Sequence, residues 1–301
     1  NYQNIFAEMI DLQAYRAANP RPKVFPKKYF IGHYLSLDLL KNLNIGFYEG
    51  VVTHDNDGTG RGFDLNYLNP IIFYRAVEHN TGNSPDNMMV AANVNYLPAK
   101  GLSLYAQYML DEFLFLEVFS RDKWWANKYG LQLGMHVVDL LDIKNLDFRL
   151  EYNMVRPYTY SHLETGNNFT HHNQPLAHPL GANFKEIIAE VTYTPHPKVF
   201  TKFRYTYSTQ GLDSGGFHFG ANIYEPYTDR PWDYNVEAGQ GVRSDIYSME
   251  FMMSYMFRHN LFFDFSMMLR TYKTEFVQLE RDDLLFNIGV RWNAIPKNLH
   301  F

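Results

Sequence analysis

The chain contains no cysteine, which excludes a disulfide framework and any metal site built from thiolates. It has no apolar run of about 18 residues, and its mean hydropathy is only -0.35, so a membrane-spanning helix is excluded. The formal net charge of -5 is mild and argues against nucleic-acid binding, which depends on neutralising phosphates. These absences leave β-structure as the only way for the chain to cross a membrane.

Enzymatic signatures are also lacking. The sequence has no Gly-x-Ser-x-Gly elbow, no phosphate-binding glycine loop and no His-Glu-x-x-His pair, and each of these motifs supplies groups that its chemistry needs at fixed spacing. Ser161 and His162 are adjacent, and neighbours on a strand project to opposite faces. We therefore predict no catalytic residue, no cofactor and no enzymatic activity.

Aromatic residues are abundant. They make up 17% of the chain, with 24 Phe and 23 Tyr, more than an ordinary soluble core requires. Belts of aromatic side chains at the two membrane interfaces would use this surplus, because an aromatic ring with a polar tip suits a boundary between lipid and water.

Apolar and polar residues alternate in segments of about ten residues, which is the period of a strand with one wet face. The alternation is clear in 146–154, 202–210 and 284–293. A soluble sandwich shows the same alternation with its apolar faces inside. In this chain the aromatics stand mainly at strand ends and the aliphatic residues nearer the middle, as in lipid-facing bands. The apolar faces of the strands are therefore predicted to point outward, into lipid.

Turn residues divide the alternating segments into twelve predicted strands. They cover 4–16, 29–41, 43–54, 87–97, 102–112, 126–138, 145–156, 183–194, 199–210, 244–257, 260–272 and 283–294. Short connections alternate with long ones, as tight periplasmic turns alternate with external loops in outer-membrane barrels. The fold class is all-β: an antiparallel transmembrane β-barrel of the outer-membrane type with about 12–14 strands.

The whole chain, residues 1–301, is interpreted as one barrel domain, because no linker or shift in composition divides it. It begins at Asn1 with neither an initiator Met nor a signal peptide, and is expected to be the mature or truncated form of a longer precursor.

The stretch from Asn69 to Glu78 breaks the alternation, and Pro70 cannot donate to a central ladder. We expect this segment to fold into the lumen and to act as a buttress held by ion pairs. The residues predicted to take part are Asn69, Arg75, Glu78, Asp111 and Glu112.

Four histidines, at 162, 171, 172 and 178, lie within seventeen residues. Imidazole is a common zinc ligand, but the spacing is not that of a helical pair, and Pro175 and Pro179 favour an extended loop. We predict no metal site here. The alternative to metal binding is a polar, aromatic-rich loop that packs over the barrel mouth and is held by hydrogen bonds within the loop.

The predicted loops combine planar hydrogen-bonding side chains with aromatic rings, the mixture that recognises sugars. The predicted site for a glycan or a protein partner consists of Trp124, Trp125, Tyr160, His162, His171, His172, Asn173, Gln174, Tyr227, Asp229 and Trp232. The structural alternative for the aromatics is the interfacial belt.

Several motifs carry a resemblance to a known family. They are HYLSLDLLKNLNIGFYEGVV, GFDLNYLNPIIFYRAVEHNTGNSPDNMMVAANVNYL, LSLYAQYMLDEF and THHNQPLAHPLGANFKE. The chain resembles the Wzi-type capsule assembly proteins, in particular their Bacteroidetes relatives linked to gliding motility. The resemblance extends from His33 to Asn293.

The resemblance implies a Gram-negative outer-membrane barrel without enzymatic activity. In the capsule branch it implies a lectin that holds capsular polysaccharide at the cell surface, which is the predicted function. In the gliding branch it implies an accessory subunit of a gliding-motility or type IX secretion complex, with protein subunits as partners. A channel for small solutes is the third hypothesis. The expected partners are thus outer-membrane lipid with either polysaccharide or protein, and no nucleic acid.

Overall fold

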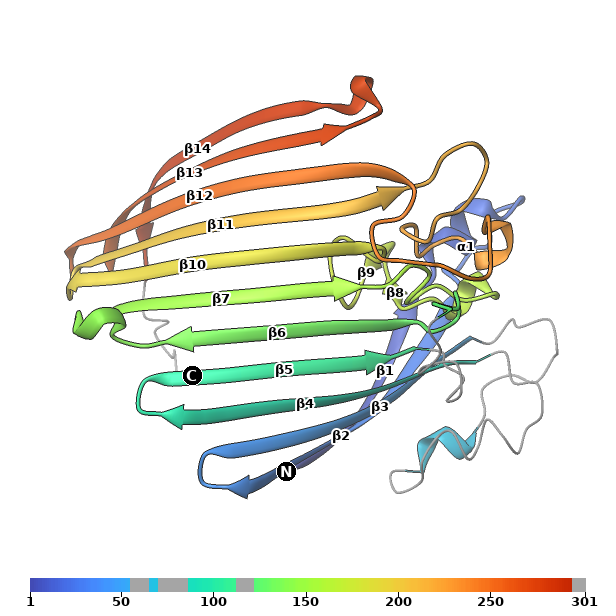
Figure 1. The fold of residues 1–301 in the computed structure, drawn as a ribbon, viewed down its shortest axis with the longest axis horizontal. Helices are drawn as coiled ribbons and strands as arrows, with labels where there is room; N and C mark the ends of the chain where they lie inside the picture. Colours follow the sequence, from blue (N-terminus) through green and yellow to red (C-terminus); the bar gives the residue numbers. More distant parts are fainter. Residues whose placement is uncertain (55–64, 70–85, 112–121, 294–301) are drawn as a thin grey trace, which may run out of the picture.

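The computed structural model describes residues 1–54, 65–69, 86–111 and 122–293. Within these ranges twelve long strands form one antiparallel sheet whose spatial order follows the chain (Figure 1). The strands are β1 (Tyr2–Ile10), β2 (Lys27–Leu40), β3 (Leu43–His54), β4 (Asn87–Ala99), β5 (Leu102–Leu110), β6 (Tyr129–Val137), β7 (Leu146–Val155), β10 (Phe184–His196), β11 (Val199–Leu212), β12 (Val242–Arg258), β13 (Leu261–Thr274) and β14 (Arg281–Trp292).

Several short elements lie in the connections between the long strands. They are the helix α1 (Leu12–Ala17), the two-stranded ribbon of β8 (Thr170–His171) and β9 (Gln174–Pro175), and the 3-10 turns η1 (Leu65–Leu68), η2 (Leu140–Asp142), η3 (Thr165–Asn167), η4 (Tyr227–Asp229) and η5 (Val277–Leu279). Among the described residues, no helix has the length and apolar character to span a membrane.

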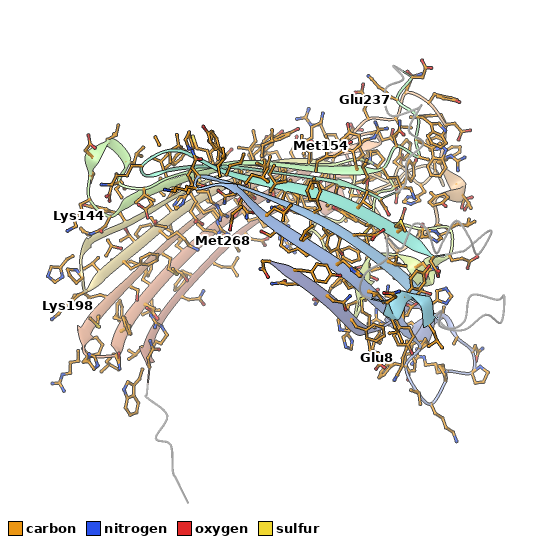
Figure 2. All side chains as sticks on the ribbon, turned by 90° about the horizontal axis from the view of Figure 1, so that it is seen from below. Glu8, Lys144, Met154, Lys198, Glu237 and Met268 are labelled. Carbon is orange, nitrogen blue, oxygen red and sulfur yellow. The ribbon has the colours of Figure 1, made fainter. Side chains whose placement is uncertain are left out.

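The connections differ between the two ends of the sheet. The turns after β2, β4, β10 and β12 are tight and lie at one end, together with the connection from β6 to β7 that holds η2. The other connections lie at the opposite end (Figure 1). In Figure 2, Lys144 and Lys198 mark the turn end, whereas Glu8 and Glu237 mark the loop end. This is the predicted asymmetry, and the prediction of an all-β antiparallel outer-membrane fold is confirmed.

One predicted strand is wrong over part of its length. The segment 4–16 was expected to be extended throughout, but β1 ends at Ile10 and the helix α1 follows. Asp11 causes the change, because its side chain accepts a hydrogen bond from the Ala14 backbone N–H at 2.9 Å and caps the helix.

The sheet curves strongly, so that it has a convex outer face and a concave inner face (Figure 2). The outer face carries exposed apolar side chains: Leu104, Leu133, Leu150, Ile187, Phe203 and Met249 are each 38–47% exposed. A soluble protein would bury such a contiguous surface, whereas lipid accepts it. The outer face is thus the lipid-facing surface of an outer-membrane barrel wall.

The buried core lies against the inner face, near the loop end. Its members come from the ends of several strands, from the connection between β7 and β10, which folds back beneath the sheet, and from the connection between β11 and β12. They are Met9, Val52, Met89, Met109, Val155, Tyr160, Ala182, Phe184 and Ile223. This core fixes the connection in place beneath the wall.

Candidate functional site

A cavity of about 630 Å³ opens on the inner face of the sheet, in the volume range of roughly 300–1,000 Å³ typical of ligand sites. Its wall is formed by β2 to β7, and the connection from β7 to β10 closes one side. The polar and aromatic side chains that line it are Tyr34, Tyr48, Asn93, Asn95, Tyr105, Gln107, Gln132, Asn153, Tyr160, Phe169 and His178.

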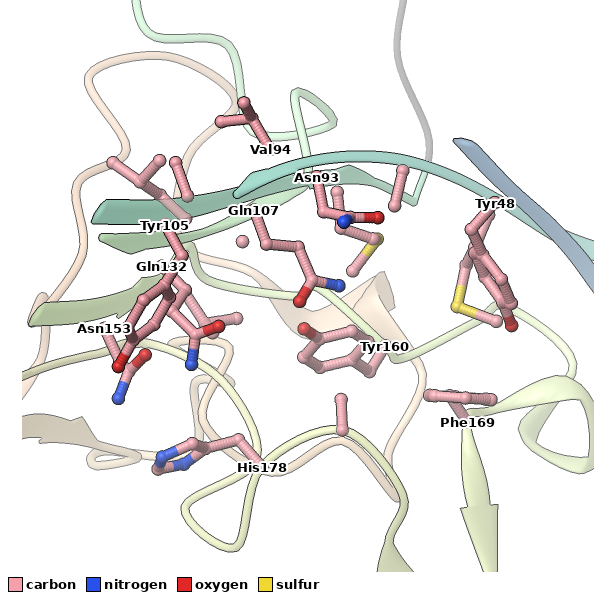
Figure 3. A pocket seen from close by; sticks show the side chains of 18 of the residues that line it. Tyr48, Asn93, Val94, Tyr105, Gln107, Gln132, Asn153, Tyr160, Phe169 and His178 are labelled. Atoms are coloured by element: carbon pink, nitrogen blue, oxygen red, sulfur yellow. The ribbon is translucent and has the colours of Figure 1, made fainter. Parts of the chain in front are cut away.

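Four amide side chains cross the cavity wall in one row, which we call the amide ladder: Asn93, Gln107, Gln132 and Asn153. Asn93 on β4 is directly opposite Gln107 on β5, Gln107 is opposite Gln132 on β6, and Gln132 is opposite Asn153 on β7. All four project from the sheet into the same space (Figure 3). Residues directly opposite each other on adjacent strands point to the same face of a sheet, so all four amides share the inner face.

Tyrosine rings lie against the wall where the neighbouring strand carries glycine. Gly134 is directly opposite Tyr105, and a Cβ at Gly134 would collide with the Tyr105 ring. Gly46 is likewise covered by Tyr34 and by the amide of Asn93. The absent side chains let both tyrosines lie close to the backbone of the wall.

Two carboxylates anchor one end of the ladder. The Tyr105 hydroxyl donates to Glu151 at 2.7 Å, and the Asn153 amide donates to Glu151 at 3.0 Å and to Glu186 at 3.3 Å. The Ser208 hydroxyl donates to the second oxygen of Glu186 at 2.8 Å. These bonds orient Asn153 and Tyr105 toward the cavity.

His178 brings the connecting segment to the same anchor. Its Nδ1 accepts from the Leu180 N–H at 3.2 Å, so the proton is on Nε2, which donates to Glu186 at 3.0 Å. Gln210 holds the next turn by donating to the carbonyl oxygens of Leu180 and Ala182. His178 thus faces the amide ladder across the cavity (Figure 3).

Tyr160 closes the cavity at the loop end. Its backbone N–H donates to Asp111 at 2.5 Å, and its side chain is only 7% exposed. Burial, assisted by the Asp111 carboxylate, raises the pKa of the Tyr160 phenol well above its usual range. The group presented to the cavity is therefore a neutral phenol.

Four residues of the predicted loop site gather at the rim, in what we call the rim cluster: Trp124, Trp125, His162 and Tyr227. Their ring centroids are 6.0 Å apart between the two tryptophans, 4.6 Å between Trp125 and Tyr227, and 6.4 Å between His162 and Tyr227. The structure therefore brings together residues from three separate loops.

Cations cover the faces of the rim cluster. The Lys128 ammonium lies 4.1 Å from the Tyr227 ring centroid and the Arg230 guanidinium lies 4.0 Å from that of Trp125. Lys128 is fully buried and donates to the Ser161 carbonyl at 3.1 Å. The rim cluster is thus a packed unit stabilised by cation–π contacts, with Trp125 only 9% exposed.

The other predicted loop residues are not part of the packed rim cluster, although Asp229 shares the η4 turn with Tyr227. His171, His172, Asn173 and Gln174 belong to the β8–β9 ribbon, where His172, Asn173 and Gln174 are exposed. Asp229 is exposed, and Trp232 is 46% exposed and contacts Phe219. Tyr160 alone among the predicted residues lines the inner cavity.

The predicted luminal group is only partly described. Arg75, Glu78 and Glu112 lie outside the described residues. Asn69 is exposed, whereas Asp111 is buried and accepts the Tyr160 hydrogen bond. Over the described ranges, no group of three or more His, Cys, Asp or Glu side chains comes together as a metal site would require.

The amide ladder is absent from the site predicted from the sequence, which considered each loop singly. Its signal was present in the alternation, which assigns all four amides to the wet face, but the ladder emerges only when four strands are set in register. A tight turn joins β4 to β5, with an irregularity between Tyr96 and Ala99, but longer connections join β5 to β6 and β6 to β7, so turn residues alone do not set the register of the four strands.

Comparison with known proteins identifies the family. The family model described as "Capsule assembly protein Wzi" matches residues 2–297. No curated protein matches the chain.

Solved structures show the same kind of fold. The structure of Wzi from Escherichia coli, described as an outer-membrane protein involved in group 1 capsule assembly and as a carbohydrate-binding β-barrel, aligns with a TM-score of 0.61 and 13% identity. The alignment covers 96% of this chain and 55% of that one, so the chain spans about half the length of that protein.

Two other solved structures are more distant. OpdQ of Pseudomonas aeruginosa aligns with a TM-score of 0.44 and 11% identity over 96% of this chain and 62% of that one. DcaP of Acinetobacter baumannii aligns with a TM-score of 0.42 and 11% identity over 95% and 70%.

Proposed function

Because the chain belongs to the Wzi family of capsule assembly proteins, we propose that it binds capsular polysaccharide at the cell surface and holds it there without catalysing a reaction. The protein is located in the outer membrane of Gram-negative bacteria, with its apolar outer face in lipid. The observation that carries the proposal is the family match, which extends over residues 2–297.

The chemistry of the described residues supports a carbohydrate ligand. The inner cavity joins amides to tyrosine rings, and sugar recognition uses hydrogen bonds to hydroxyl groups beside aromatic faces. The exposed Asn173, Gln174 and Trp232 offer the same combination on the loops. A long polysaccharide could contact both regions.

The test combines a cell measurement with a binding measurement. We expect deletion of the gene to release capsule into the medium, and the purified protein in detergent to retain labelled capsular polysaccharide. Retained capsule after deletion, together with no binding by the purified protein, would contradict the proposal.

The same preparation tests the two alternatives. Stoichiometric partner chains that co-purify in detergent would support an accessory subunit of a gliding-motility or type IX secretion complex, as the Bacteroidetes resemblance predicts. Steady conductance in planar bilayers would support a small-solute channel. No described contact favours either alternative over polysaccharide binding.

A further inference from the structure

We propose that the amide ladder is a saccharide subsite inside the barrel wall, which takes a short, uncharged stretch of glycan lying across β4 to β7. This inference rests on the proposed polysaccharide binding and specifies where a segment of the ligand is held and which sugars it contains. It places this contact on the inner face of the wall, whereas the loop residues predicted from the sequence, apart from Tyr160, are outside the cavity.

The spacing of the ladder is set by the sheet. Adjacent strands lie about 4.8 Å apart, so four amides in register offer a regular row of donors and acceptors across three strand intervals. Each amide presents a carbonyl acceptor and two N–H donors. A chain of sugar units, with hydroxyl groups at regular intervals, can bond to successive members of such a row.

Part of the ladder is free to bind a ligand. Asn153 is already committed to Glu151 and Glu186. By contrast, among the residues that the structure describes, neither Asn93 nor Gln107 makes a side-chain hydrogen bond, and Gln107 is exposed to the cavity. In Figure 3 the Gln107 amide points into the open space toward Tyr160. A ligand can therefore use the donors and acceptors of these two amides without breaking a side-chain hydrogen bond among the described residues.

Aromatic surfaces flank the free amides. Tyr105 lies over Gly134 and Tyr34 over Gly46, at positions where any larger residue would push the ring away from the wall. Tyr105 is held in place by its hydrogen bond to Glu151. Fixed rings beside free amides give the apolar faces and the hydroxyl groups of a sugar separate contacts.

The charges around the cavity select the kind of sugar. Among the described residues, the cavity lining contains neither lysine nor arginine, and the two ionisable groups bonded to the ladder, Glu151 and Glu186, are both carboxylates. A uronic acid would meet like charge from these two carboxylates, which costs binding energy. The subsite therefore favours neutral or N-acetylated sugars.

The binding experiment uses the full chain in detergent and short oligosaccharides released from capsular polysaccharide by partial acid hydrolysis. Replacing Gln107 by leucine keeps the size of the side chain and removes its hydrogen bonds. We expect Q107L to weaken oligosaccharide binding by up to about tenfold, and N93L/Q107L to weaken it further, because each lost bond is worth about one kcal/mol. Each variant is folded if, like the wild type, it migrates differently on gels before and after heating.

Gln278→Leu is the matched control, since this exposed glutamine lies in η5, between β13 and β14, and outside the cavity. We expect Q278L to bind the oligosaccharides as the wild type does. Wild-type affinity in both Q107L and N93L/Q107L would overturn the subsite while leaving the proposed function standing. Failure of the wild type to bind whole polysaccharide would instead contradict the proposed function and the subsite together.

The selectivity is tested with polysaccharide whose uronic acids have been reduced to neutral sugars. We expect the reduced material to bind at least as tightly as the untreated material, with the loss in Q107L preserved. Disappearance of the difference between Q107L and wild type after reduction would show that the ladder recognises charged sugars and would overturn this part of the inference.

Discussion

Single residues shape the inner wall through pairs of glycine and tyrosine. A Cβ at Gly134 would meet the Tyr105 ring, and the missing side chain lets that ring lie beside the wall and reach Glu151. Aromatic side chains often cover strand glycines in this way. Glycine weakens a strand by itself, so its presence at this position is explained by the tyrosine that it admits.

We expect Gly134→Val to destabilise the protein by about 1–3 kcal/mol, because overpacking displaces Tyr105 and breaks its bond to Glu151. Urea unfolding in lipid vesicles, followed by tryptophan fluorescence, measures the change. Gly289→Val is the matched control, since a Cβ at Gly289 has no described atom within 4 Å. Equal effects of the two substitutions would show that contact with Tyr105 is not what Gly134 provides.

At the scale of elements, one asparagine joins the external connections. Asn183 is fully buried, and its amide donates to the carbonyl oxygens of Gly211, Phe219 and Gln240 at 3.0, 3.1 and 2.8 Å. Its side-chain oxygen accepts from the Gly239 N–H at 2.7 Å. The connection ending at β10 is thus tied to the one between β11 and β12.

We expect Asn183→Asp to loosen both connections, because a carboxylate would replace the donor that faces three carbonyl oxygens. Buried groups left without partners cost about 1–3 kcal/mol each. Limited proteolysis should then cut within 211–241 faster than in the wild type. Asn173→Asp is the control, since that exposed residue has the same φ of 59°; comparable cleavage in both variants would contradict the role of Asn183.

A second link between elements depends on pH. The His171 Nδ1 accepts from the Ile10 N–H at 3.0 Å, so the neutral ring joins the β8–β9 ribbon to the end of β1. Burial, together with His172 and Lys28, holds the pKa of His171 below its ordinary value of 6.5. A depressed folded-state pKa means that the stabilisation is complete above 6.5 and is lost as the pH falls toward the folded-state value.

We therefore expect hydrogen exchange at the end of β1, corrected for the intrinsic rate, to be faster at about pH 5 than at about pH 7.5, where the ring is neutral. His171→Gln supplies an acceptor that does not titrate and should remove most of this pH dependence. An unchanged pH dependence in H171Q would assign the effect to another group.

The strands were largely predictable from the sequence, and the site was not. Alternation located all twelve strands to within a few residues, except where Asp11 ends β1 and begins α1. The prediction grouped the loop aromatics as one surface, but Trp125 is packed beneath Arg230 whereas Trp232 is exposed. Which loop aromatics are buried depends on long-range contacts such as the buried Lys128, which no local pattern reveals.

At the scale of the whole molecule, one curved sheet separates two environments. Its convex face exposes aliphatic and aromatic side chains, and its concave face carries the amides, carboxylates and tyrosines of the cavity. This division accounts for the low mean hydropathy of a membrane protein, since only alternate residues meet lipid. Both the outer-membrane location and the proposed polysaccharide binding depend on it.

Thiol labelling of two adjacent residues tests this division most directly. The chain has no native cysteine, so only the introduced thiol can react. Gln132 lines the cavity, and its neighbour Leu133 is 45% exposed on the outer face. In lipid vesicles, we expect Gln132→Cys to react with a water-soluble maleimide and Leu133→Cys to react only with a lipid-soluble one. Equal reaction of both cysteines with the water-soluble reagent would contradict a lipid-facing outer surface.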